Sequence, residues 1–287
     1  MNELSVRKWF AALALLPGML TVAAAAADGD AVAGRNSPPA ASTPSPITDR
    51  FAIQAAWWRA SASTDARIDN TAGITTGTPF SAEQDLGLPD SLSRAHVEIM
   101  VRLKQRGKLR FDMLDLARKG SVVLTRTIRY GGQTYVPGER VNSRFDWRAL
   151  NFTWTYELLH NDRFEAGLGL GLHLIQAEAV ASVPTRASRE SFDGAGPFAT
   201  IAGDAALRIT RRFALTARAQ TFRLTVSDTT GMLADYHADL QFRWRPNLAF
   251  GLGYQSNRIE LDAPNENPGG NMQFDVSGPE LFLRASF

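Results

Sequence analysis

The chain has 287 residues, no cysteine and a formal net charge of only +2. Without cysteine no part of the fold depends on a disulfide, and so small a net charge gives no reason to expect a nucleic-acid partner. After residue 27 no stretch reaches about 18 uninterrupted apolar residues, which argues against transmembrane helices but leaves open a membrane-spanning barrel, whose strands carry a weaker hydropathy signal.

Residues 1–27 have the three parts of a secretory signal peptide. Arg7 and Lys8 give a positive start, an apolar stretch follows at 9–20, and the alanine run at 23–27 offers small-residue cleavage sites. We therefore expect an exported protein whose mature chain begins near residue 27 or 28.

Residues 28–49, DGDAVAGRNSPPAASTPSPITD, are rich in Ala, Ser and Pro and poor in large apolar side chains. A segment of this composition buries too little apolar surface to offset the entropy lost on ordering. We expect it to be a disordered segment ahead of a single folded domain at 50–287.

Alternation with a period of two dominates the rest of the chain. In YHADLQFRWR, residues 236–245, Tyr236, Leu240 and Trp244 share one face, while His237 and Arg243 share the other with further polar residues. That pattern predicts a strand with one apolar and one charged side, since a helical period would scatter the charges around the axis.

Turn residues divide the domain into about ten strands, with eight as the alternative count. The predicted strands lie near 50–62, 94–106, 107–130, 139–159, 163–182, 193–210, 212–227, 232–245, 247–262 and 271–287. The alternation breaks around Leu114 and Asp115, which suggests a bulge. Very short connections alternate along the chain with connections that are mostly longer. The sequence therefore predicts an all-β, closed, up-and-down antiparallel barrel.

Two features place the apolar face outside, in lipid. Tyr236 and Trp244 lie eight residues apart, which corresponds to roughly 20 Å along the membrane normal for a tilted strand. That distance is close to the spacing of the aromatic girdles of a transmembrane barrel. Glycines such as Gly169 and Gly251 lie on the opposite face, where a crowded lumen needs small side chains. A soluble periplasmic barrel of lipocalin type, with the apolar face inside, is the alternative.

The last residues, ELFLRASF, place Leu281, Leu283 and Phe287 on one face. This resembles the C-terminal strand of bacterial outer-membrane β-barrels, which ends on an aromatic residue. The resemblance implies an outer-membrane location, contact with outer-membrane lipid, and recognition of these three residues by the barrel-assembly machinery.

With the apolar face in lipid, the lumen carries charges of both signs. The predicted lumen network consists of His96, Glu98, Arg102, Arg110, Asp112, Glu165, His173, Asp204, Arg208, Arg218, Asp235, His237, Asp239 and Arg243. In a narrow barrel these side chains could interlock and fill most of the lumen. The mixed signs fit an occluded lumen, and they also fit a narrow channel for small polar solutes.

His237 lies between Asp235 and Asp239, and we expect it close to the loop end of its strand, where Asp235 could orient the imidazole. The spacing resembles the Asp-x-His element of omptins, outer-membrane proteases with an active site at the extracellular rim. Omptins also need a second acidic pair, and no Asp-x-Asp occurs in a matching place. A structural ion network therefore outweighs a rim hydrolase, and no metal or cofactor motif is found.

The longest predicted connection, 63–93, is the segment most suited to recognition at the surface, or else a solvated cap over the barrel mouth. The sequence names no ligand for it. We expect a small outer-membrane barrel with a structural or surface-binding role; a narrow channel, a rim hydrolase and a soluble periplasmic barrel remain as alternatives.

Overall fold

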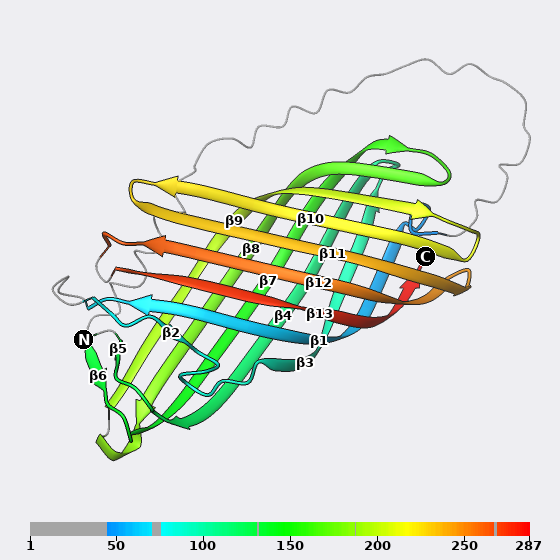
Figure 1. Ribbon diagram of the computed structural model, residues 1–287. Helices are drawn as coiled ribbons and strands as arrows, with labels where there is room; N and C mark the ends of the chain where they lie inside the picture. The colour runs from blue at the N-terminus through cyan, green and yellow to red at the C-terminus, as the bar shows by residue number, and fades with distance from the viewer. Residues whose placement is uncertain (1–44, 71–75, 131, 187, 267–268) are drawn as a thin grey trace, which may run out of the picture.

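The computed structural model describes residues 45–70, 76–130, 132–186, 188–266 and 269–287. Within these ranges ten long antiparallel strands close into a barrel (Figure 1). They are β1 (Phe51–Ile68), β3 (Ser91–Leu103), β4 (Gly107–Val123), β7 (Arg140–His160), β8 (Phe164–Val183), β9 (Ser188–Arg208), β10 (Phe213–Val226), β11 (Thr229–Arg245), β12 (Leu248–Ala263) and β13 (Gly270–Ser286). The predicted fold class and count of ten are confirmed, and the alternative count of eight is wrong.

Three short strands and one turn of 3-10 helix complete the described elements. β2 (Phe80–Ser81) pairs with β1 beyond the end of β3, while β5 (Ile128–Tyr130) and β6 (Gln133–Tyr135) form a separate hairpin. The 3-10 turn, η1 (Pro184–Arg186), connects β8 to β9. In the part of the chain that the structure describes, no helix is long and apolar enough to cross a membrane.

The last strand closes the barrel against the first. β13 pairs with β1 from Ala52 opposite Ser286 to Ile68 opposite Gly270. The backbone of Phe287 continues this seam, because its N–H donates to the carbonyl of Phe51 at 2.8 Å and its carbonyl accepts from the N–H of Phe51 at 3.0 Å. Pairing of these two strands removes the open edges that a ten-stranded sheet would otherwise present.

The two ends of the barrel differ. One end, here called the turn end, carries the C-terminus and the four short connections at 104–106, 161–163, 209–212 and 246–247. The other end, the loop end, carries the connections at 69–90, 124–139, 184–187, 227–228 and 264–269. The turn end lies at the right in Figure 1, next to the label of the C-terminus.

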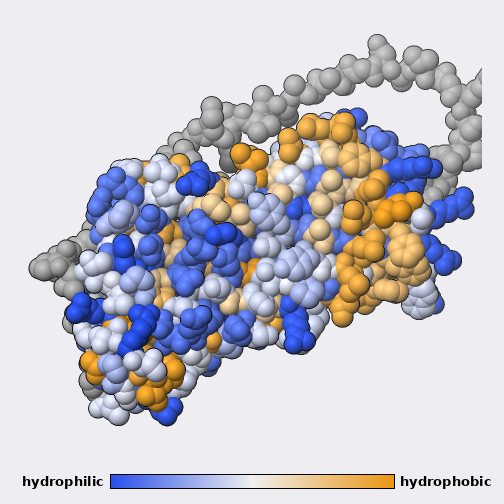
Figure 2. Space-filling view, viewed as in Figure 1, coloured by the Kyte–Doolittle hydropathy of each residue, from blue (hydrophilic) through white to orange (hydrophobic). Residues whose placement is uncertain are grey.

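The outer surface changes character along the barrel. Near the turn end, exposed apolar side chains such as Ile53, Trp57 and Leu283 face outward, whereas Arg59 and Asp65 face outward nearer the loop end of β1. Figure 2 shows the same division, with hydrophobic residues gathered at the turn end and hydrophilic residues over the loop end. The apolar band is the part that matches a lipid environment.

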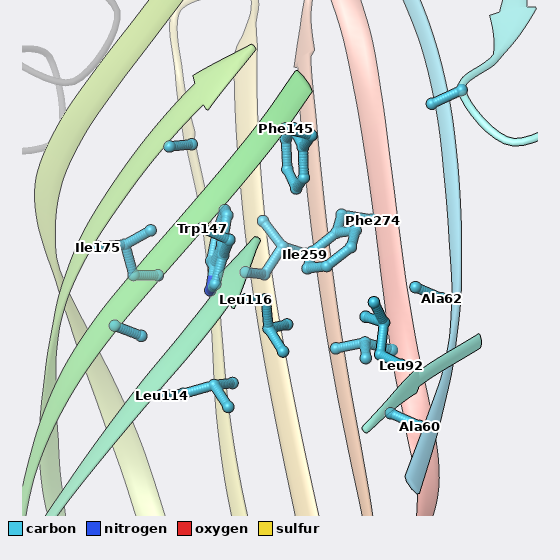
Figure 3. Packing of buried hydrophobic residues seen from close by; sticks show 14 of the residues in the cluster. Ala60, Ala62, Leu92, Leu114, Leu116, Phe145, Trp147, Ile175, Ile259 and Phe274 are labelled. Carbon is cyan, nitrogen blue, oxygen red and sulfur yellow. The ribbon is translucent and has the colours of Figure 1, made fainter. Parts of the chain in front are cut away.

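The interior changes in the opposite sense. At the level of the outer apolar band the lumen is polar and charged, but nearer the loop end it is a hydrophobic core that includes Trp58, Leu116, Phe145, Trp147 and Phe274 (Figure 3). The adjacent residues Trp57, which is 57 % exposed, and Trp58, which is fully buried, mark the level on β1 where this change occurs. The loop half of the barrel thus packs like a water-soluble protein.

The predicted bulge near Leu114 and Asp115 is wrong. β4 pairs with β7 in one continuous register from Gly107 to Val123, and Leu114 faces the lumen as Asp112 does. The pattern of apolar residues changes here because the strand leaves the apolar band, so that the apolar side chains move from the outer to the inner face. Register shifts occur instead at 157–159 on β7 and 243–245 on β11.

Several predicted boundaries are corrected. The predicted strand 107–130 is two elements, β4 and β5, separated by a connection at 124–127. The predicted loop 63–93 is shorter, since β1 continues to Ile68 and β3 begins at Ser91, and the loop itself contains β2. The extension of β1 beyond the apolar band accounts for the shorter loop.

The predicted signal peptide 1–27 and residues 28–44 of the predicted disordered segment lie outside the described residues. The last five residues of that segment, 45–49, form a turn at the turn end in which Ser45, Ile47 and Asp49 are buried. The ordered domain therefore begins at least five residues before the predicted start.

Candidate functional site

Lys108 is the centre of the charge network in the lumen. Its side chain is almost fully buried, and its Nζ atom lies 2.5 Å from Glu157 Oε1, 2.7 Å from Glu165 Oε1 and 2.5 Å from Asp204 Oδ2. Four strands, β4, β7, β8 and β9, supply these groups. A buried ammonium group is stable only with such partners, because desolvation of an unpaired charge is costly.

Two arginines extend this cluster. Arg110 Nη2 lies 3.0 Å from Asp204 Oδ2, and Arg102 Nη1 lies 3.1 Å from Glu165 Oε2. The cluster thus contains three cations, Lys108 and the two arginines, and three carboxylates, those of Glu157, Glu165 and Asp204. The balance of signs explains how a narrow lumen holds so many buried charges.

A second chain of contacts crosses the lumen from β3 to β13. Glu98 pairs with Arg218, which donates to His237 Nδ1. Since a guanidinium only donates, Nδ1 accepts and the imidazole proton lies on Nε2, which donates to Glu280 Oε1 at 2.7 Å. His96 Nε2 lies 3.4 Å from the other oxygen of Glu280.

Residues 45–49 close the lumen at the turn end. Asp49 Oδ2 accepts from Arg243 Nη2 at 2.6 Å and lies 3.7 Å from Arg284 Nε. Arg102 donates to the carbonyl oxygens of Asp49 and Pro46 at 3.2 and 3.1 Å. The cavity left between this segment and the charge network is only about 20 Å³, room for a water molecule or two.

The remaining predicted lumen residues have separate partners. His173 Nε2 lies 3.0 Å from Gln220 Oε1, Asn151 donates to Asp112 at 2.7 Å, and Thr216 donates to Asp239. Arg208 is half-buried at the turn end of β9 and forms no ion pair with another described residue. The predicted network is therefore brought together in part, as two linked clusters with separate polar pairs around them.

The arrangement around His237 differs from the predicted one. β11 begins at Thr229, so His237 lies eight residues from the loop end of its strand and is buried in the lumen. Asp235 accepts from Asn257 at 3.4 Å, and the groups that orient His237 are Arg218 and Glu280. Within the described ranges no group of His, Asp and Glu side chains is arranged to hold a metal ion.

Sequence reasoning missed several members of these clusters. The missed residues are Asp49, Lys108, Glu280 and Arg284 as network members, together with Gln220. Glu280 and Arg284 follow the same alternation as the predicted residues, and Lys108 lies two positions before Arg110. Alternation along each strand could have found all of these residues except Asp49, which precedes β1.

The predicted assembly residues all lie on the outer surface of the apolar band. Leu281 and Leu283 are exposed on β13, and Phe287 is 70 % exposed beside Phe51, with 6.3 Å between the ring centroids. These side chains are therefore available to lipid or to another protein.

A cavity of about 90 Å³ lies in the loop half of the barrel. Its walls come from β1, β7, β8, β9, β12 and β13, and they include Phe145, Trp147, Ile175 and Ile259, which Figure 3 shows pointing into the same interior space. Below the loop 76–90, the buried Arg118 donates to Thr64 Oγ1 at 2.5 Å and pairs with Glu83.

The connections above the cavity are fastened to one another. Arg126 donates to Asp85 at 2.8 and 2.6 Å and to the carbonyl of Pro79 at 2.9 Å, which joins the connection after β4 to the loop that contains β2. The hydrogen bond from Arg126 holds the pKa of Asp85 below its usual range. Phe80 and Tyr130 meet edge to face at 5.8 Å beneath this link.

No protein-family model and no curated protein sequence matches the chain. Among solved structures, the outer membrane protease OmpT from Escherichia coli is similar, with a TM-score of 0.54, 10% identity and coverage of 86% of this chain and 100% of that one. Ail of Yersinia pestis in complex with a heparin analogue (TM-score 0.32, 9% identity, 81% and 99% coverage) and Neisserial surface protein A (0.32, 12%, 83% and 97%) are more distant. With its closed barrel of ten strands, the chain has the fold of the bacterial outer-membrane β-barrels.

Proposed function

We propose that the protein is an integral outer-membrane barrel that does not conduct solutes and that acts by binding at its loop half, outside the membrane. The outer apolar band and the exposed ring of Phe287 support insertion into lipid. The positive, apolar and small-residue parts of 1–27 support export through a cleaved signal peptide. The C-terminal residues Leu281, Leu283 and Phe287 would be read by the barrel-assembly machinery.

One observation carries the non-conducting role: the lumen is filled at the level of the apolar band. A water path would have to separate Lys108 from its three carboxylates or Arg218 from Glu98 and His237. It would also have to displace residues 45–49 from Arg102, Arg243 and Arg284. These are two barriers in series, and each consists of buried, mutually paired charges.

The length of the strands, the polar outer surface and the hydrophobic core of the loop half support the binding role. Strands such as β1, β7 and β8 continue well beyond the apolar band, with a polar outer surface and a hydrophobic core. A barrel that only had to span the membrane would need strands of about 9–11 residues, and β7 has 21. The added length builds a folded region in the water outside the membrane.

The test is the conductance of the purified full-length mature protein in planar bilayers. Insertion is checked separately in liposomes by heat-modifiable mobility in gel electrophoresis. We expect a folded, inserted barrel without discrete conductance steps, both for the wild type and for Arg243→Ala, which loosens residues 45–49 but leaves the Lys108 cluster intact. Discrete steps in the wild type would overturn this proposal in favour of the channel.

The likeness to the outer membrane protease OmpT makes a rim hydrolase the second candidate. Its imidazole would be His237, which is buried and held between Arg218 and Glu280. A library of fluorogenic peptides, assayed with the wild type and with His237→Ala, decides the matter. Cleavage that His237→Ala abolishes while the variant stays folded would establish the hydrolase.

A further inference from the structure

The cavity in the loop half is built from apolar side chains. Six of the residues that line it are Phe80, Phe145, Trp147, Ile175, Ala177 and Phe198. A cavity with such walls is unfavourable for water, which needs two to four polar partners, and an apolar cavity of about 150 Å³ in another protein stays dry and takes up benzene. At about 90 Å³, this cavity limits an occupant to roughly one ring.

Charged residues near the cavity do not offer their charges to its interior. Arg67, Arg144 and Glu260 occupy positions on the outer faces of their strands, and Arg144 pairs there with Asp146. Thr64 is on the inner face, but its hydroxyl oxygen already accepts from Arg118. A charged ligand would therefore lose its hydration without gaining a partner.

Ser143 is the exception among the polar residues of the inner face. Its side chain is 6 % exposed, it lines the cavity, and its hydroxyl has no hydrogen-bond partner among the described residues. A buried hydroxyl without a partner is unfavourable, so one matching group on a ligand would be stabilised there. The site thus combines an apolar, aromatic wall with a single polar contact.

At the loop end, the connections after β1 and β4 cover the cavity. Phe80 and Leu86, from the loop after β1, and Tyr130, from the β5–β6 hairpin, form its outer wall. The pair of Arg126 and Asp85 joins these two connections to each other, and the Arg126 side chain is 44 % exposed. The loop after β1 is attached to the barrel by the pairing of β2 with β1 and by the pair of Glu83 and Arg118. A ligand from outside the cell would enter by displacing this cover, without crossing the membrane.

We propose that this cavity binds a small, uncharged, aromatic molecule of about one ring that carries a single hydrogen-bonding group, with Ser143 as its partner. The proposal deepens the binding role proposed above by naming its ligand class. It does not depend on whether the lumen conducts, so the two tests fail independently.

The experiment uses the full-length mature protein in lipid nanodiscs and three matched probes: fluorobenzene, 4-fluorophenol and 4-fluorobenzoate. Binding is followed by ¹⁹F NMR, with empty nanodiscs as the measure of uptake by lipid. We expect saturable binding of fluorobenzene and 4-fluorophenol, with 4-fluorophenol favoured by about fivefold, the factor that one ordinary hydrogen bond contributes. The anion 4-fluorobenzoate should not bind.

Two variants with matched controls locate the site. Ala177→Leu fills the cavity and should abolish binding of both probes, whereas Ala117→Leu, on the outer face of β4, should leave it unchanged. Ser143→Ala should remove the preference for 4-fluorophenol but keep fluorobenzene binding. A wild type that takes up no more probe than empty nanodiscs, or equal binding by wild type and folded Ala177→Leu, would overturn the proposal.

Discussion

At the scale of single residues, Lys108 is the side chain on which the lumen depends most. Replacing it with Met leaves Glu157, Glu165 and Asp204 buried without the ammonium group that lies within 2.7 Å of each. Removing one partner of a buried ionic cluster typically costs about 3 to 5 kcal/mol. We expect Lys108→Met to lower the free energy of unfolding by that amount in urea titrations of the protein in lipid vesicles.

The matched control is Lys119→Met on the same strand, whose side chain is exposed on the outer face of β4. That change should stay within about 0.5 kcal/mol of the wild type. Equal stability of the two variants would mean that the carboxylates of the cluster do not rely on Lys108.

Phe287 should matter for assembly more than for stability. Its ring is 70 % exposed, so Phe287→Ala removes little buried surface from the finished barrel. We expect the variant to yield less folded, heat-modifiable protein in cells, while the fraction that does fold unfolds at nearly the wild-type urea concentration. Phe213→Ala, another exposed ring at the turn end, is the control, and an equal loss of folded protein with it would argue against a special role for Phe287.

At the scale of elements, the cover over the cavity should loosen in acid. Arg126 lowers the pKa of Asp85, so the carboxylate favours the folded cover above its ordinary pKa of about 4, and this contribution is lost as the pH falls through the lowered value. Amide hydrogen exchange of residues 76–90 should therefore be faster at pH 3 than at neutral pH, after correction for the intrinsic rate. Because the pair is partly exposed, the effect is a local opening and not unfolding of the barrel.

The variant Asp85→Asn should show the loosened cover already at neutral pH and a smaller further change in acid than the wild type. If wild type and Asp85→Asn were equally protected at pH 7, the contact between Asp85 and Arg126 would not fasten the cover.

One of the partly paired seams in the wall of the barrel lies between β9 and β10. β9 pairs with β10 only from Ile201 to Arg208, although β9 continues to Ser188 and stays paired with β8 along its other edge. Alternate amides of β9 between 188 and 200 point away from β8 and lack a strand partner there. We expect these amides to exchange within minutes while those of the neighbouring β8 stay protected, and uniform protection of β9 would show that β10 closes against it in solution.

The strands show how far sequence reasoning reaches in this protein. Alternation in β11 identified the outer face of Tyr236 and Trp244 and the inward position of His237 correctly, because period and face are local properties. The reversal at Leu114 looked like a bulge, since a single strand does not reveal where the membrane ends. Partners across the lumen, such as Lys108 with Asp204, depend on register between distant strands, which alternation alone does not supply.

At the scale of the whole molecule, two opposite patterns are joined end to end. The turn half is apolar outside and charged inside, and the loop half is polar outside and hydrophobic inside. Each half is stable only in its own surroundings, so the boundary between them fixes the depth of the barrel in a membrane. A soluble periplasmic barrel would have to leave the entire outer apolar band exposed to water.

The absence of native cysteine makes this depth measurable with single-cysteine variants. On β12 both Leu252 and Arg258 are exposed on the outer face, but Leu252 lies in the apolar band and Arg258 lies beyond it. In proteoliposomes, a membrane-impermeant maleimide should label Arg258→Cys and leave Leu252→Cys unlabelled, with both reacting after denaturation. Rapid labelling of both sites in the native protein would place the apolar band in water and favour the soluble barrel, because only lipid shields an exposed side chain at Leu252 from the reagent.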